Sequence, residues 1–331
     1  MQNVFSNTLF LVEEGPELSG KSSAVGRLGQ IIEHAIPILS ERSGTRIRLK
    51  KIREPGGSPQ GDRGRTFVLN ILALQEIAET QLKDDTKAEL FTWARWGLYD
   101  DLVPEIKNTE GFTIYLGDRS YLSMMALQGK WNERPNGVEL QELEESALWA
   151  TKELLPDAAI LRKFPSAGLS EEISFRQLLI LLNGREIMPQ DLAPSDDFIK
   201  VQNRFDELAN RYRDSVKFHE VNASENPLHS TLQEIVIVAR SLTEKFPSFV
   251  FEEVLSVLMT SYQTIKNEGS LKEAESMLED QNRIRKLLVS LGLTAEQIMN
   301  SYRAGDDSHL NEVRLRYAEH IENGMSPQAR K

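Results

Sequence analysis

Short apolar runs alternate with longer amphipathic stretches over the first 245 residues of the chain. Each short run is followed directly by a turn or by the start of a helix, which is typical of parallel strands joined by helical crossovers. We therefore predict an α/β fold with three layers, in which a five-stranded parallel sheet lies between helices. The expected strands are Thr8 to Glu13, Arg46 to Arg53, Phe112 to Gly117, Asp157 to Leu161 and Lys217 to Asn222.

The pattern changes after Lys245. Apolar residues between Phe251 and Leu288 fall at helical spacing, and no further strand signal follows. Pro247 suits the first turn of a helix and disfavours helix at the residue before it, so one helix should end here and another begin. We expect one domain over residues 1–245 and an all-helical C-terminal domain of three or four helices over residues 246–331.

Composition narrows the class of protein. The chain has 331 residues, of which 40% are hydrophobic, which is too much apolar material for a disordered polymer and enough for two folded units. The net charge of −11 argues against a general nucleic-acid-binding protein, because such proteins neutralise phosphates with clustered Lys and Arg. Cysteine is absent, which excludes disulfides, thiolate metal sites and a cysteine nucleophile. With no basic leader and no long apolar segment, we expect a cytoplasmic protein without membrane or nucleic-acid partners.

The segment after the first expected strand matches GxxxxGK[ST] in the strand-loop-helix context that this motif requires. Its glycines allow a tight turn with inward N–H groups, Lys21 adds a point charge, and the hydroxyl of Ser22 can ligate Mg²⁺. Such a loop holds the phosphates of a nucleotide. The expected ATP-binding residues are Gly15, Pro16, Glu17, Leu18, Ser19, Gly20, Lys21, Ser22 and Ser23.

Two more loops should lie at the same edge of the sheet. The Arg53-Glu54-Pro55-Gly56-Gly57 string follows the second strand, at the carboxyl edge where open α/β folds bind ligands. Asp118 and Arg119 follow the third strand, where the carboxylate can reach Mg²⁺ and the guanidinium can bind a phosphate. A phosphate loop alone does not distinguish kinases from GTPases, motor ATPases or transporters. The two further loops are therefore needed to choose among these classes.

With these three loops in this order, the chain resembles the thymidylate kinase family, the nucleoside monophosphate kinases that phosphorylate dTMP. The likeness extends from about Leu9 to Leu242. It is most specific at Glu14-Gly15 with the phosphate loop, Arg53 to Gly57, Leu90-Phe91 with Arg95, and Asp118-Arg119 with Ser123 and Gln128-Gly129. The resemblance implies a P-loop NTPase fold and in-line transfer of phosphate from ATP to dTMP, with Mg²⁺ bound by Ser22 and Asp118.

The resemblance also implies a role for each matching residue. Phe91 would stack on the thymine ring and Arg95 would hydrogen-bond its edge, while Arg53 and Arg119 would hold the acceptor phosphate. Glu17 would lie near the acceptor sugar. The substrate-binding set it implies is Glu17, Arg53, Phe91, Arg95, Arg119, Ser123 and Gln128, and the catalytic set is Lys21, Arg53, Arg119 and Arg185.

Several positions depart from the family pattern. Ser120 stands where an aromatic residue or histidine is usual, and the Asp-Arg-Ser string is similar to that of deoxyribonucleoside kinases, which remain an alternative on substrate. A lid is expected over residues 164–195, where Arg176 and Arg185 are the candidate charges and the usual lid motif is not recognisable. A divergent nucleotide-binding protein with a regulatory role is the second alternative. The C-terminal helices could dock on the kinase core, form a homodimer interface or receive a partner.

Overall fold

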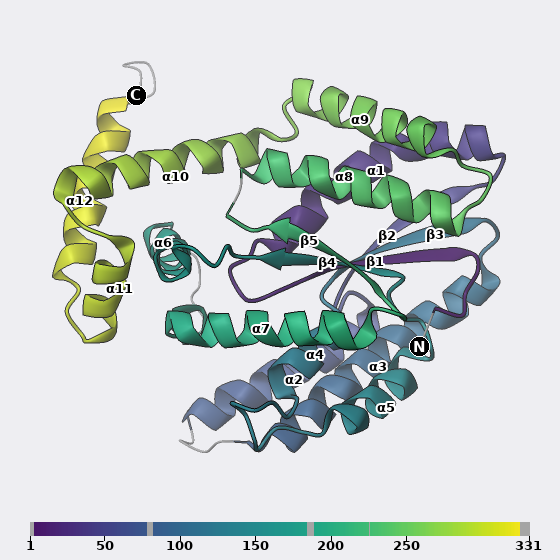
Figure 1. Cartoon of the computed structure of the whole chain (residues 1–331), viewed down its shortest axis with the longest axis horizontal. Helices are drawn as coiled ribbons and strands as arrows, with labels where there is room; N and C mark the ends of the chain where they lie inside the picture. Colours follow the sequence, from purple (N-terminus) through teal and green to yellow (C-terminus); the bar gives the residue numbers. More distant parts are fainter. Residues whose placement is uncertain (1–2, 78–81, 184–188, 225, 325–331) are drawn as a thin grey trace.

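The computed structural model describes residues 3–77, 82–183, 189–224 and 226–324. These residues form one parallel sheet of five strands in the order β2-β3-β1-β4-β5, which confirms the predicted α/β class (Figure 1). The strands are β1 (Thr8–Glu14), β2 (Ile47–Arg53), β3 (Phe112–Asp118), β4 (Ala158–Lys163) and β5 (Lys217–Asn222).

Helices cover both faces of this sheet. One face carries α1 (Lys21–Ser43), α8 (Pro227–Lys245) and α9 (Phe251–Asn267). The other carries α3 (Asp84–Asn108), α4 (Tyr121–Gln128), α5 (Leu140–Thr151) and α7 (Ser195–Tyr212), with α2 (Pro59–Ile77) packed on α3. The three layers were therefore predicted correctly.

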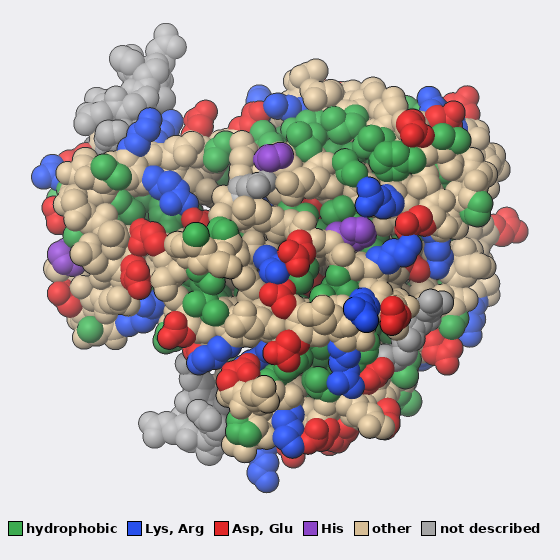
Figure 2. Space-filling model, in the orientation of Figure 1, with side chains coloured by type: hydrophobic (Ala, Val, Ile, Leu, Met, Phe, Trp, Pro, Cys, Tyr) green, Lys and Arg blue, Asp and Glu red, His purple; other side chains and the backbone are tan. Residues whose placement is uncertain are grey.

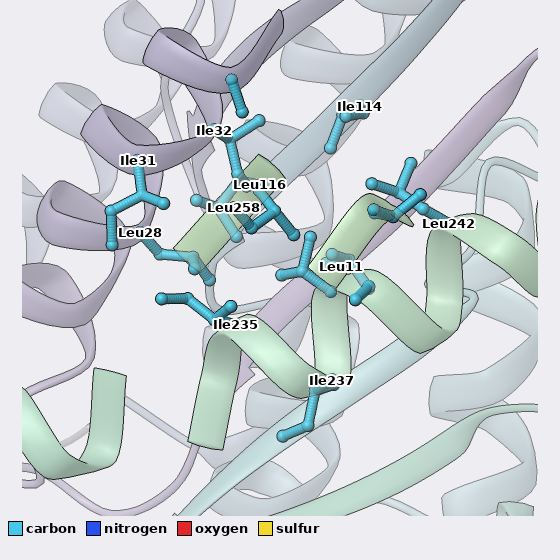
Figure 3. Close-up of a cluster of buried hydrophobic side chains, with 14 of the residues drawn as sticks. Leu11, Leu28, Ile31, Ile32, Ile114, Leu116, Ile235, Ile237, Leu242 and Leu258 are labelled. Atoms are coloured by element: carbon cyan, nitrogen blue, oxygen red, sulfur yellow. The ribbon is translucent and has the colours of Figure 1, made fainter. Parts of the chain in front are cut away.

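The central strand β1 is buried on both faces, so its apolar side chains alternate between two cores. Leu9 and Leu11 belong to the core beneath α1, α8 and α9, whereas Phe10 and Val12 belong to the opposite one. Figure 3 shows Leu11 in the first core, among side chains from all three covering helices. The two cores fix the sheet and therefore the carboxyl edge from which the loops leave.

Four helices follow β5 and α8 in the described part of the C-terminal region. They are α9, α10 (Lys272–Leu291), α11 (Ala295–Arg303) and α12 (Ser308–Gly324). The first of them, α9, packs on α1 and α8 and shares their core through Val254 and Leu258. By contrast, α10, α11 and α12 form a separate apolar cluster with α6 (Leu169–Leu182), beside which they lie in Figure 1. The expected domain boundary at residue 245 stays a prediction. Helix α9, which follows that residue, packs into the core on one face of the sheet.

The surface carries both signs of charge. Figure 2 shows Lys and Arg side chains interspersed with Asp and Glu over the described part of the visible face. No described helix is long and apolar enough to cross a bilayer.

Candidate active site

The phosphate loop runs from β1 into α1 with the backbone that its glycines permit. Gly15 and Gly20 have φ angles of 134° and 84°, a region that favours glycine. At Gly15 a side chain would also collide with the sheet, because an added Cβ would lie 2.4 Å from the carbonyl oxygen of Arg162. Since α1 begins at Lys21, its unpaired N-terminal N–H groups face the loop and favour an anion there.

Lys21 lies inside this loop and is 5% exposed. Its Nζ donates hydrogen bonds to the carbonyl oxygens of Gly15 at 3.1 Å and Pro16 at 2.6 Å. Burial, and after it the nearby positive charge of Arg119, lower the pKa of Lys21 to about 8. A bound phosphate would oppose both effects and favour the charged ammonium.

Ser22 and Asp118, the two expected metal ligands, lie side by side. The Ser22 hydroxyl donates to Oδ2 of Asp118 at 2.5 Å, and the register pairs Asp118 with Glu13 of β1 and Arg53 of β2. Mg²⁺ prefers hard oxygen ligands and usually takes only one or two from the protein, keeping waters and substrate phosphates for the rest. A hydroxyl beside a carboxylate at the phosphate loop fits that donor set. No group of three or more His, Asp or Glu ligands occurs among the described residues.

Arg119 connects the phosphate loop with the start of α4. It has a positive φ of 73°, and its guanidinium donates to Ser123 Oγ at 3.0 Å and to Glu17 Oε1 at 2.5 Å. Arg53 lies beside Asp118, 4.0 Å from its Oδ2, and its side chain is 59% exposed. The structure therefore brings together Glu17, Arg119 and Ser123, with Arg53 at the same edge.

Glu14 is buried and holds the start of α4 in place, a role that its sequence context did not predict. Its carboxylate accepts hydrogen bonds from the backbone N–H and hydroxyl of Ser120, both at 2.7 Å, and from the hydroxyl of Ser123 at 2.6 Å. Burial raises the pKa of Glu14. Ser120 also caps α4 by accepting from Leu122 N. The departure from the family pattern at Ser120 therefore has a structural role.

Arg95 lies in a second buried cluster on α3. Its Nε donates to Oε2 of Glu54 at 2.5 Å, Tyr99 donates to the other oxygen of that carboxylate, and Nη1 lies 3.3 Å from Sδ of Met124. Glu54 was not among the predicted site residues, although it stands inside the Arg-Glu-Pro-Gly-Gly string. It fixes Arg95 at the carboxyl edge of β2.

Phe91 and Gln128 lie on helices that flank this cluster. Phe91, on α3, is half-buried and packs against the core of that side of the sheet. Gln128, the last residue of α4, is 8% exposed. Their expected contacts with a base stay predictions.

Sequence reasoning missed Arg162, which supports the phosphate loop from β4. Its Nε donates to the carbonyl oxygen of Ser19 at 2.9 Å, and its Nη1 is ion-paired with Glu234 of α8. Glu13 lies nearby, 3.8 Å from Nη1 of Arg162. Burial, and after it the charge of Glu234, raise the pKa of Glu13 well above its usual value. The available signal was a charged residue directly after four apolar ones in each of two strands, Glu13 in β1 and Arg162 in β4.

Arg176 and Arg185 are the two candidate arginines of the predicted lid. Of these, Arg185 lies outside the described residues. Arg176 of α6 donates through Nε to Glu172 and through Nη2 to the carbonyl oxygen of Ala223, both at 2.9 Å. It is thus engaged within the protein. A catalytic arginine from this segment stays a prediction.

The fold and the three loops together define a nucleotide-binding protein of the P-loop class. The sheet order, the GxxxxGKS loop entering α1 and the Asp118-Arg119 pair at the end of β3 are the defining features.

Comparison with known proteins gives the family. The chain is 31% identical over 180 residues to the thymidylate kinase of Thermomicrobium roseum, a match that covers 54% of this chain and 74% of that protein. It is 27% identical over 262 residues to the thymidylate kinase of Mesoplasma florum, covering 78% and 99%. The chain belongs to the thymidylate kinase family.

A scan of family models found none that matches the chain. The solved thymidylate kinase of Ehrlichia chaffeensis aligns with 70% of this chain and 98% of its own, at 16% identity and a TM-score of 0.43.

Proposed function

We propose that this protein transfers the γ-phosphate of ATP to dTMP, with Mg²⁺, and releases ADP and dTDP. The observation that carries the proposal is the convergence of a phosphate loop, the Ser22–Asp118 pair and Arg119 at one edge of the sheet. Curated relatives named thymidylate kinase support dTMP as the acceptor.

Each residue would contribute positioning or charge. Phosphoryl transfer needs an in-line arrangement and positive charge near the transferred group, and little covalent chemistry. Lys21 and the N-terminus of α1 would hold the ATP phosphates, while Arg53 and Arg119 would hold the acceptor phosphate. Ser22 and Asp118 would hold Mg²⁺, which supplies charge neutralisation between the phosphates when bound. The attacking oxygen of a monophosphate has a low pKa, so the reaction requires no strong general base.

A nucleoside kinase is the second candidate, and one observation favours it. Arg119, which would hold the acceptor phosphate, is already paired with the carboxylate of Glu17. A dianionic acceptor would have to compete with this carboxylate, whereas an uncharged nucleoside would not.

Coupled ADP release tests the acceptor. The purified protein with ATP and Mg²⁺ is offered dTMP, dUMP, dCMP, dGMP, dAMP and thymidine in turn. The proposal predicts the highest kcat/KM with dTMP. A preference for thymidine would move the protein to the nucleoside kinases. ATP binding without turnover of any acceptor would favour the regulatory alternative.

The predicted homodimer and cytoplasmic location remain part of the proposal. Within one chain, buried apolar residues of α9 pack with α1 and α8, and buried apolar residues of α10–α12 pack with α6. Light scattering on the purified protein measures the oligomeric state, and cell fractionation measures the location.

A further inference from the structure

Helix α6 lies between the phosphate loop and the C-terminal helices. Leu169 and Ile173 on one side of α6 belong to an apolar cluster against which Leu18 of the phosphate loop packs. Phe175 and Leu178 belong to the cluster shared with α10, α11 and α12. Residues four apart share a helix face, so the two sets lie on different faces of one helix. A single rigid element thus connects the phosphate loop with the C-terminal region.

Polar contacts fix α6 on the C-terminal helices. The Glu171 carboxylate accepts the backbone N–H groups of Ala295 and Glu296, at 2.8 and 3.0 Å, and so satisfies the first turn of α11. Arg303 of α11 donates to the buried side-chain oxygen of Gln177 at 2.5 Å. These contacts are directional, so they set the position of α6 as well as its attachment.

One buried carboxylate on α6 is shared by two arginines. Glu172 accepts from Arg176 through Oε1 at 2.9 Å and from Arg285 of α10 through Oε2 at 2.6 Å. The Arg285 guanidinium also lies over the ring of Phe175, 3.8 Å from its centroid. Arg176 continues the chain of contacts to the carbonyl oxygen of Ala223, and Ala223 belongs to the same cluster as Ile173. The contacts therefore lead from α10 to the cluster under Leu18.

We propose that Arg285 is a positioning residue that acts through Glu172 and α6 on the tip of the phosphate loop and so sets the affinity for ATP. On this proposal, the C-terminal helices contribute to the affinity for ATP. The inference rests on the proposed function only in that the phosphate loop binds ATP.

Arg285→Met in the full chain tests this, because methionine keeps much of the apolar stem and removes the guanidinium. Arg283→Met is the matched control, since Arg283 lies on the same helix and pairs with Glu279 and Asp280 of that helix. Arg285→Lys tests rescue by charge. Hydrogen exchange is measured across the chain, and binding of a non-hydrolysable ATP analogue with Mg²⁺ is measured by calorimetry without any acceptor.

We expect Arg285→Met to speed exchange in residues 169–182 and to raise the Kd for the ATP analogue about fivefold, a typical coupling between sites. Exchange in β1 and β3 should stay as in the wild type, Arg283→Met should resemble the wild type, and Arg285→Lys should recover part of the affinity. Unchanged exchange in α6 would overturn the inference. So would faster exchange throughout the sheet, or faster exchange in α6 with unchanged affinity.

The outcomes separate this inference from the proposed function. ATP binding without dTMP turnover by the wild type contradicts the proposed acceptor alone and leaves the Arg285 comparison valid. Failure of the wild type to bind the ATP analogue contradicts both.

Discussion

Lys21 places a buried ammonium where the phosphates of ATP are expected to bind. Burial and Arg119 lower its pKa to about 8 in the free protein, so the protonated form is retained at neutral pH and lost above that value. Because phosphate binds the ammonium form, nucleotide binding and protonation of Lys21 are linked.

ATP affinity should therefore fall as the pH rises above about 8, by at most about tenfold per pH unit. Calorimetric titration with ATP and Mg²⁺ between pH 7.5 and 9.5 measures this. Lys21→Arg is the control, because a guanidinium does not titrate in this range and its profile should be flat. An equally flat profile for the wild type would contradict the role given to Lys21.

Glu13 gives a second pH effect, this time on stability. Its pKa is raised in the folded state by burial and by Glu234, so the folded protein binds a proton that the unfolded chain releases above its own pKa of about 4.3. Stability from this group is present below that unfolded value and is lost as the pH rises through the raised folded value.

Glu13→Gln should remove this loss. Urea denaturation at pH 5 and pH 8 measures the free energy of unfolding, and the variant should lose less of it between the two values than the wild type does. Equal losses for both proteins would show that the folded pKa of Glu13 is not raised above its unfolded value.

At the scale of elements, the Arg162–Glu234 pair joins β4 to α8 beneath the phosphate loop. Both side chains are buried, and Arg162 also holds the carbonyl oxygen of Ser19. Removing one partner of a buried ion pair leaves an uncompensated charge, whereas replacing both with apolar groups does not.

Arg162→Met should lower the free energy of unfolding by about 3–5 kcal/mol. The Arg162→Met, Glu234→Met double variant should recover much of that loss. Urea denaturation of the wild type, both single variants and the double variant measures the coupling. Simple additivity of the two single effects would mean that the pair is not coupled.

The elements were predictable where a local pattern encodes them. Apolar runs followed by turns gave all five strands, and the glycines and Lys21 gave the phosphate loop. Three strands extend further than predicted, to Glu14, Asp118 and Lys163. These polar residues pair with neighbouring strands, and the local sequence does not show that pairing. Arg162 was missed for a related reason, since its partners lie on β1, the phosphate loop and α8 and meet only in the fold.

At the scale of the whole molecule, the C-terminal helices belong to two different cores. Helix α9 completes the core over α1 and α8, to which Leu271 also belongs, while α10–α12 cover α6. The change of pattern after Lys245 was visible in the sequence. Which surfaces the helices cover was not, because amphipathic periodicity shows an apolar face without naming its partner.

Two truncations distinguish these contributions. A chain ending at Lys245 should fail to fold cooperatively, because the core over α1 and α8 would lose Val254, Leu258 and their neighbours. A chain ending at Leu271 should keep a cooperative transition but expose the apolar face of α6. Thermal denaturation followed by circular dichroism tests both. A cooperative transition for the chain ending at Lys245, equal to that of the full chain, would instead establish residues 1–245 as an independent domain.

The central claim is transfer of phosphate from ATP to dTMP, and identification of the product tests it most directly. Phosphorus NMR of the protein with ATP, Mg²⁺ and dTMP should show dTDP forming together with ADP, in equal amounts. Lys21→Met, which removes the ammonium from the phosphate loop, should form dTDP at least about 100-fold more slowly. ADP without dTDP, or no reaction by a folded wild-type protein that binds ATP, would contradict the claim.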